Sequence, residues 1–206
     1  MNIRCLERMR GSLLAGAVLT AVVVCAAQAQ VTVASGSSAR VDSRAGFTLI
    51  SPDIADAKEI PETQVFNSLG CTGRNISPAL SWSHVPDGTQ SFALLVHDPD
   101  APMAGGWWHW MVYNIPGNVT SLPADAGNPA KHLMPGTTVQ GRSDFGTPGY
   151  GGPCPPPGKP HHYYFRLYAL KVAKLDVPPG ATPAIIGARV NANSLGEAQI
   201  MGLYGR

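Results

Sequence analysis

Charged residues are scarce in this chain of 206 residues, at 14% of the total, and neither sign dominates. The formal net charge of +2 arises at the amino terminus, where Arg4, Arg8 and Arg10 outnumber Glu7. From residue 30 onward the chain carries twelve basic and twelve acidic side chains. Binding to a phosphate backbone needs a basic excess, so we expect no nucleic-acid partner.

Long apolar runs are also lacking. The most apolar segment, residues 13–27, is too short for a stable membrane anchor, and it follows the three arginines. Ala27-Gln28-Ala29 has the A-x-A form of a cleavage site. Cys25 raises a lipoprotein alternative, but valine precedes it where a small residue is expected. We therefore predict a signal peptide over 1–29, a flexible segment over 30–45 and one domain over 46–206. The mature protein would be periplasmic or secreted, without an integral membrane span.

Cysteine is equally rare. Of four cysteines in the chain, only Cys71 and Cys154 remain after the predicted cleavage. An even number in an exported protein favours a disulfide, and we predict one between these two residues. Two separate buried thiols are the alternative.

Residues 92–113 are the centre of the chain's pattern. Residues 92–96 (FALLV) form an apolar run with the length of a buried strand. Pro99 and Pro102 end it, because proline has no N–H for a strand ladder, and residues 108–113 (WHWMVY) predict a return strand. Asp98 and His109 would therefore meet at strand ends. Taken alone, Asp98 is also explained as a turn former.

Further short strands are predicted at 47–50, 79–82 and 163–170, with 65–66 as an edge segment. Their short, regular spacing indicates a mainly β domain, a sandwich or an open barrel. Thr182 and Pro183 form a helix start, and a weak apolar period extends that helix to about Ile200. Residues 202–206 are expected to be a short closing strand or tail.

Glycine and proline alternate in residues 149–158 (GYGGPCPPPG). Glycine allows the backbone to approach a ligand closely, and proline stiffens the segment that would present those amides. A surface linker would have the same composition. The strand predicted after it places the segment inside one domain and disfavours the linker.

These motifs together resemble the phosphatidylethanolamine-binding protein family, in its bacterial Raf-kinase-inhibitor-like branch. The resemblance lies in residues 75–78 (NISP), 98–102 (DPDAP), 107–110 (WWHW), 149–156 (GYGGPCPP) and 161–163 (HHY). It implies a large central β-sheet with a smaller sheet packed on it, a C-terminal helix and an anion pocket at one end of the large sheet. The pocket would be formed by Asp98, Trp107, His109, Gly151, Gly152, Pro153, His161 and Tyr163. His162 departs from the family, where arginine is common.

The chemistry of these residues agrees with an anion pocket. Loop amides and imidazoles can donate to an anion, and aromatic rings can form an apolar wall. We expect Asp98 to orient His109 or His161, or to accept a ligand amine. If both histidines donate as imidazolium, anion affinity should rise as the pH falls from about 8 to about 6.

We therefore expect an exported, non-catalytic protein that binds a small phosphorylated or anionic ligand, without a cofactor or metal. A hydrolase or other enzyme using the same residues is the alternative. It is disfavoured because the sequence has no G-x-S-x-G motif and no H-x-x-x-H spacing. The resemblance further suggests a kinase or protease as protein partner, and a homodimer.

Overall fold

A computed structural model of the chain describes residues 46–206. The predicted signal peptide and flexible segment, residues 1–45, lie outside the described residues. Within 46–206, no helix has both the length and the apolar character needed to cross a membrane.

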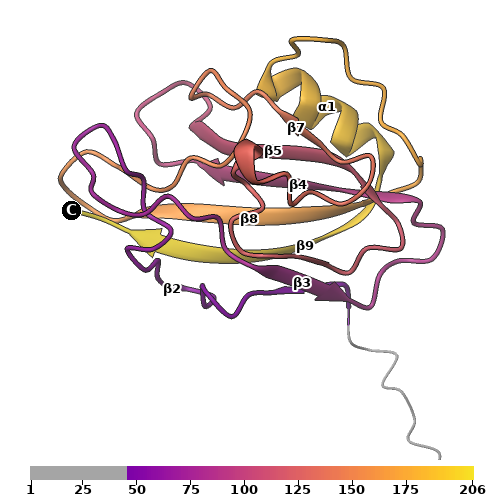
Figure 1. Cartoon of the computed structure of the whole chain (residues 1–206), viewed down its shortest axis with the longest axis horizontal. Coiled ribbons are helices and arrows are strands. Elements are labelled where there is room, and N and C mark those ends of the chain that lie inside the picture. Colours follow the sequence, from indigo (N-terminus) through magenta and orange to yellow (C-terminus); the bar gives the residue numbers. More distant parts are fainter. Residues whose placement is uncertain (1–45) are drawn as a thin grey trace, which may run out of the picture. The chain divides into compact units, whose positions relative to one another are not determined.

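The domain is built on a six-stranded sheet. Its order is β2 (Lys58–Glu59), β9 (Ser194–Tyr204), β8 (His161–Leu170), β4 (Ser91–Asp98), β5 (Trp107–Pro116) and β7 (Val139–Gly141). Neighbouring strands are antiparallel except β2 and β9, which are parallel. Figure 1 shows the four long strands side by side, from β9 through β8 and β4 to β5.

A smaller antiparallel sheet covers one face of the large sheet. It has the order β1 (Thr48–Ile50), β3 (Leu80–Ser83) and β6 (Ser121–Leu122). Its inward side chains, Leu49, Trp82 and Leu122, belong to one buried cluster with Phe92 and Leu94 of β4. The mainly β fold with two packed sheets is therefore confirmed.

The other face of the large sheet packs on a helix. α1 (Pro183–Asn193) contributes Ile186 and Val190 to a second buried cluster that includes Ala93 and Leu95 of β4. Thus β4 is buried on both faces, which explains why its sequence is a continuous apolar run rather than an alternating one. A short 3-10 helix, η1 (Pro129–Lys131), lies in the long connection after β6.

Two sequence predictions fail in the detail. Thr182 caps α1 and Pro183 opens it, as predicted, but the helix ends at Asn193 instead of near Ile200. The remainder is the eleven-residue strand β9, paired along its length with β8. Residues 65–66 form no strand. They lie in a loop, from which the Val65 side chain packs into the buried core.

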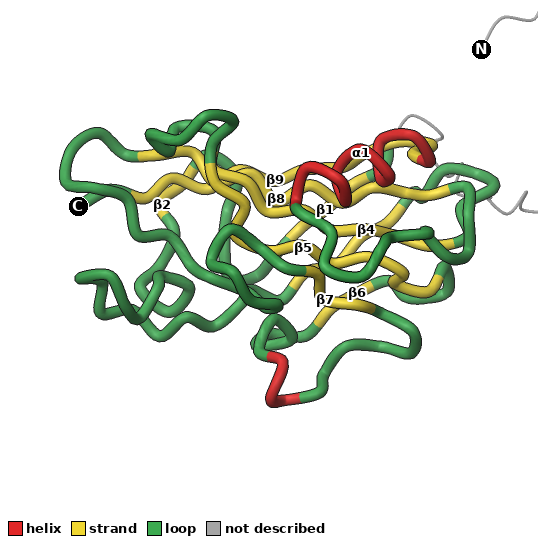
Figure 2. The backbone as a smooth tube through the Cα atoms, turned by 90° about the horizontal axis from the view of Figure 1, so that it is seen from above, coloured by secondary structure: helices red, strands yellow, loops and turns green. Residues whose placement is uncertain are grey.

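Strand ends and loops gather at one end of the large sheet. β4 ends there, β8 begins there and β9 finishes there, because His161 pairs with Tyr204 and Tyr164 with His97. This end lies near the carboxyl terminus of the chain, on the left in Figures 1 and 2, where the loops drawn in green accumulate.

Candidate functional site

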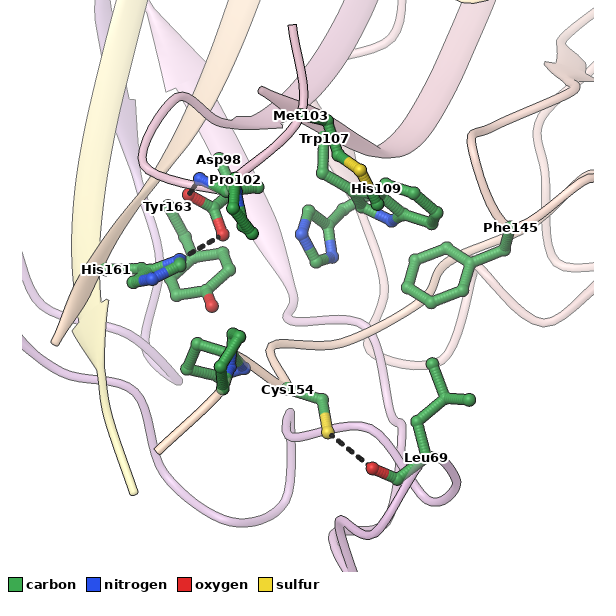
Figure 3. A pocket seen from close by; sticks show the side chains of 13 residues that line it. Leu69, Asp98, Pro102, Met103, Trp107, His109, Phe145, Cys154, His161 and Tyr163 are labelled. Atoms are coloured by element: carbon green, nitrogen blue, oxygen red, sulfur yellow. Dashed lines mark hydrogen bonds and ion pairs between the residues drawn. The ribbon is translucent and has the colours of Figure 1, made fainter. Parts of the chain in front are cut away.

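A cavity of about 180 Å³ opens at this end of the sheet. Figure 3 shows polar side chains on one side of the cavity and aromatic and aliphatic side chains on the other. The lining is formed by Leu69, Asp98, Ala101, Pro102, Met103, Trp107, His109, Phe145, Cys154, Pro155, Pro156, His161 and Tyr163.

Asp98 is both a turn former and a pocket residue. Its Oδ1 accepts hydrogen bonds from the backbone N–H groups of Asp100 and Ala101, at 2.9 and 3.1 Å, which shape the turn after β4. Its Oδ2 accepts a hydrogen bond from His161 Nδ1 at 2.8 Å. Of the two histidines that Asp98 could orient, it therefore contacts His161. The carboxylate is buried, and each of its oxygens has a partner.

A β-bulge aims His109 into the pocket. The pairing of β4 with β5 passes from Val96–Trp110 directly to His97–Trp108, so His109 is the extra residue on β5. Such an extra residue interrupts the alternation of faces and redirects a side chain. As a result His109 and Trp110 are both buried on the pocket side of the sheet, where His109 contacts Tyr163 edge to face.

Gly151 holds the imidazole of His109 in one tautomer. His109 Nδ1 lies 2.7 Å from the carbonyl oxygen of Gly151, and the Gly151 N–H donates to the carbonyl oxygen of His109 at 3.0 Å. Because a carbonyl only accepts, Nδ1 carries the hydrogen. Nε2 is buried and has no partner in the described part of the protein. Burial lowers the pKa of His109 to about 4.

The structure without ligand therefore does not favour the predicted role of His109 as an imidazolium donor near pH 6. Its Nδ1 hydrogen is already used, and its Nε2 is a lone-pair acceptor at neutral pH. The expectation assumed an ordinary histidine pKa, which burial at 4% exposure does not permit.

Tyr163 completes the polar side of the cavity. It stands on β8 two residues from His161, on the same face of the strand. Its hydroxyl is buried and has no hydrogen-bond partner within the geometric limits among residues 46–206. Burial, and then the charge of the nearby Asp98 carboxylate, raise the pKa of Tyr163, so the hydroxyl keeps its proton and can donate it.

Trp107 and Phe145 form the aromatic wall. Their rings meet edge to face at 5.4 Å between centroids, and Phe145 also meets His109 at 5.5 Å. Trp107 lines the pocket as expected, whereas its neighbour Trp108 stacks on His97. Phe145 was not predicted. Its only signal was an aromatic residue within a charged loop.

Gly151, Gly152 and Pro153 lie behind the pocket instead of lining it. The Gly152 N–H donates to Asn75 Oδ1 at 2.7 Å, and the Pro153 carbonyl accepts from the Phe66 N–H. A Cβ on Gly152 would contact backbone atoms of residues 64–66. Gly151 faces an adjoining hollow. These amides are thus committed within the protein, and the wall is formed by the next residues, Cys154, Pro155 and Pro156.

Asn75, the first residue of the NISP motif, positions the loop of residues 150–152, a role that the sequence alone did not reveal. It adopts a left-handed backbone conformation with φ of 52°. Its side chain accepts from Gly152 and donates from Nδ2 to the carbonyl oxygen of Tyr150 at 3.2 Å. Both bonds fix the loop that in turn holds His109.

The predicted disulfide is present. Cys71 and Cys154 are joined with an S–S distance of 2.06 Å across 83 residues of sequence. The bond links the loop that carries Leu69 to the loop that carries Pro155, and both loops form walls of the pocket. Disulfides persist in oxidising compartments, so the bond favours an exported protein.

A second histidine–aspartate pair lies beside the pocket. His162 Nδ1 is 2.6 Å from Asp100 Oδ2, and the pair is close to half exposed. The His162 backbone N–H also donates to Asp100 Oδ2, at 2.8 Å. The hydrogen bonds from the His162 side chain and backbone lower the pKa of Asp100. The two histidines at the start of β8 therefore bind the two aspartates of the turn separately, and only the His161–Asp98 pair lines the cavity.

Metal ligation is not favoured by this arrangement. Across residues 46–206, no three or more His, Cys, Asp or Glu side chains are grouped in a way that could hold a metal ion. The conceivable set of Asp98, His109 and His161 is divided, because His161 directs Nδ1 at Asp98 and His109 directs Nδ1 at Gly151.

Comparison with known proteins agrees with this architecture. The family model described as phosphatidylethanolamine-binding protein matches residues 50–205. The UPF0098 protein YbcL of Escherichia coli K12 is 48% identical over 161 residues, which are 78% of this chain and 88% of YbcL. YbhB of the same organism is 44% identical over 76% of this chain and 98% of its own length. None of these names denotes an enzyme.

Solved structures show the same fold. The crystal structure of E. coli YbcL, described as a new member of the mammalian PEBP family, matches with a TM-score of 0.76 over 79% of this chain and 99% of YbcL.

A further relative by sequence is a Mycobacterium tuberculosis protein named as lipoprotein LppC, which is 39% identical over 77% of this chain and 72% of its own length. With the sheet, the pocket and the motifs in place, the chain belongs to the phosphatidylethanolamine-binding protein family.

Proposed function

We propose that this protein is an exported, non-catalytic binding protein for a small phosphorylated or otherwise anionic ligand. The observation that carries the proposal is the pair of buried polar atoms without partners in the pocket, Tyr163 Oη and His109 Nε2. An unpaired buried polar atom costs about 1–3 kcal/mol, which a ligand that pairs with it would recover.

The pocket fits an oxygen-rich head group attached to an apolar portion. The Tyr163 hydroxyl is a donor, and His161 gains a donor at Nε2 when it is protonated, with Asp98 balancing the charge. Trp107, Phe145 and the prolines supply an apolar wall on the other side. The small volume limits the enclosed part of the ligand to a head group of phosphate size.

A binding role is favoured over catalysis by what lines the cavity. Among residues 46–206, the lining contains no serine, threonine or lysine that could act as a nucleophile, and the cysteine it does contain is in the disulfide. Asp98 already accepts three hydrogen bonds, which leaves its carboxylate less available as a general base. Export to the periplasm is supported by the disulfide and by the relative named as a lipoprotein.

Thermal unfolding with phosphoethanolamine tests the proposal. Millimolar ligand should raise the Tm of the mature protein, because binding to the folded state alone stabilises it by mass action. Tyr163→Phe and Asp98→Asn should lose the shift. His162→Ala is the matched control, since it breaks an aspartate–histidine pair outside the cavity, and it should keep the shift. An unchanged Tm for the wild type, or equal shifts in all variants, would remove the support for this pocket.

A further inference from the structure

The polar atoms of the pocket form an unusual set for an anion site. Among residues 46–206, no lysine or arginine lines the cavity. Of the groups that do line it, Tyr163 Oη offers one hydrogen and His161 offers one at Nε2 only when it is protonated, whereas Asp98 and His109 Nε2 are acceptors. A fully ionised oxyanion would thus meet the Tyr163 donor, joined by His161 when that residue is protonated, and it would face the lone pair of His109 Nε2.

His109 Nε2 is the group that decides which ligand fits. Its acceptor state is fixed from behind, because Nδ1 donates to Gly151 and because Asn75 in turn holds that loop through Gly152. The imidazole is 4% exposed and packs edge to face against the rings of Tyr163 and Phe145, and a rotated ring would lose the hydrogen bond from Nδ1 to Gly151.

The titratable groups around His109 do not change this assignment. Asp98 at the end of β4 and His161 and Tyr163 on β8 share the cavity with it, and His97 stacks on Trp108 nearby. The Asp98 carboxylate favours an imidazolium at His109, but burial outweighs it, and the pKa of His109 remains about 4. The acceptor is therefore present throughout the neutral range.

We propose that the pocket selects an oxyanion that carries its own proton, such as phosphate or a phosphomonoester monoanion, over one that carries none, such as sulfate or a phosphodiester. The P–OH group would donate to His109 Nε2, and the ionised oxygens would accept from Tyr163 Oη. This inference rests on the proposed function, since it names the chemical class of the ligand in the same pocket.

The physical basis is the cost of an unpaired acceptor in a buried site. Sulfate and dimethyl phosphate would place a lone pair against Nε2, so the hydrogen bond would be lost and two acceptors would face each other. A penalty of about 1–3 kcal/mol corresponds to roughly a fivefold to hundredfold loss of affinity. The first expected result is therefore that phosphate binds at least about fivefold more tightly than sulfate at pH 7.

Isothermal calorimetry, which measures the affinity of the protein for four small oxyanions, tests the proposed selection for a protonated ligand. Phosphate keeps a proton from pH 5.5 to pH 7.5, methyl phosphate loses its proton near pH 6, and sulfate and dimethyl phosphate have none throughout. Affinity for methyl phosphate should therefore fall about tenfold more than affinity for dimethyl phosphate between pH 6.5 and pH 7.5, in proportion to its protonated fraction, because any change in His161 protonation affects both ligands. Methyl phosphate has no amine, so any proton offered to His109 comes from the phosphate group.

A substitution identifies the source of the preference. His109→Gln places an amide that can either donate or accept near Nε2, so phosphate and sulfate should bind this variant with affinities within about threefold. His162→Gln changes a histidine outside the cavity and should keep the wild-type preference. ¹⁵N resonances of the His109 ring then report its protonation state with phosphate bound, independently of any variant.

The outcomes separate this inference from the proposed function. If no oxyanion binds, the proposed function fails and this inference fails with it. If phosphate and sulfate bind equally, if His109→Gln keeps the preference, or if His109 is an imidazolium in the phosphate complex, the pocket binds anions without selecting for a proton. The proposed function would then stand and this inference would be wrong.

Discussion

Acid should destabilise this protein through the single side chain of His109. The unfolded chain has a histidine pKa of 6.5, whereas burial lowers that of His109 to about 4 in the folded protein. Between these values the unfolded state binds a proton that the folded state does not. The free energy of unfolding therefore decreases as the pH falls from 6.5 toward 4.

The magnitude follows from the two pKa values. Each pKa unit corresponds to about 1.4 kcal/mol, so the whole window costs about 3 kcal/mol, and pH 4.5 should already cost between about 2 and 3 kcal/mol. Domains of this size have total stabilities of about 5–15 kcal/mol, so the loss is a large share. The Asp100 carboxyl group affects stability in a lower pH range. Because its pKa in the folded protein is below the ordinary value of 3.8, it stabilises the fold above pH 3.8, and this contribution is lost as the pH falls further.

Urea unfolding at pH 7.0 and pH 4.5, without phosphate, measures the effect in the wild type and in His109→Gln. Glutamine is also a polar side chain that can form hydrogen bonds, but it does not titrate. The wild type should lose about 2–3 kcal/mol more than the variant between the two pH values. Equal losses in both proteins would show that His109 is not a buried neutral imidazole, and both its tautomer and its acceptor role would have to be abandoned.

Two further predictions concern stability alone. Replacing both cysteines, by Cys71→Ser and Cys154→Ser, should lower the free energy of unfolding by up to about 4 kcal/mol. The reason is that a loop of 83 residues is no longer closed in the unfolded state. Urea unfolding of the double variant measures the loss, and an unchanged midpoint would contradict the prediction. Gly152→Ala should lower the Tm by an amount equivalent to about 1–3 kcal/mol, because its Cβ has no room beside residues 64–66. Gly187→Ala is the matched control, since space is open around that helical glycine, and it should instead stabilise by about 0.5–1 kcal/mol.

Much of the fold was predictable because local patterns and long-range packing agree. The apolar run of β4 is continuous because both faces of this strand are covered, and Thr182 with Pro183 marks the start of α1. The end of α1 was missed for an equally physical reason. In β9 the buried positions Ala198, Ile200 and Tyr204 alternate, but outward-facing Met201 and Leu203 hide the period of two.

The site was predictable in its residue types and not in its contacts. Asp98, Trp107, His109, His161 and Tyr163 all line the cavity as expected. The role of Gly151 could not be read from the sequence, since a backbone amide's partner depends on which distant segment lies against it. Here that segment is the bulge of β5, and the amides expected to bind an anion are bonded within the protein.

The bulge in β5 means that this site depends on a residue count as well as on residue identities. Deleting one residue between Trp107 and Trp110 would let the pairing with β4 run without interruption from Val96 to Asp98. Every side chain in the outer end of the strand would then turn to the opposite face. A homologue could keep an aspartate, a tryptophan and a histidine in the same order and still have no acceptor in its cavity. Insertions and deletions within this strand are therefore as informative about ligand choice as substitutions in the pocket.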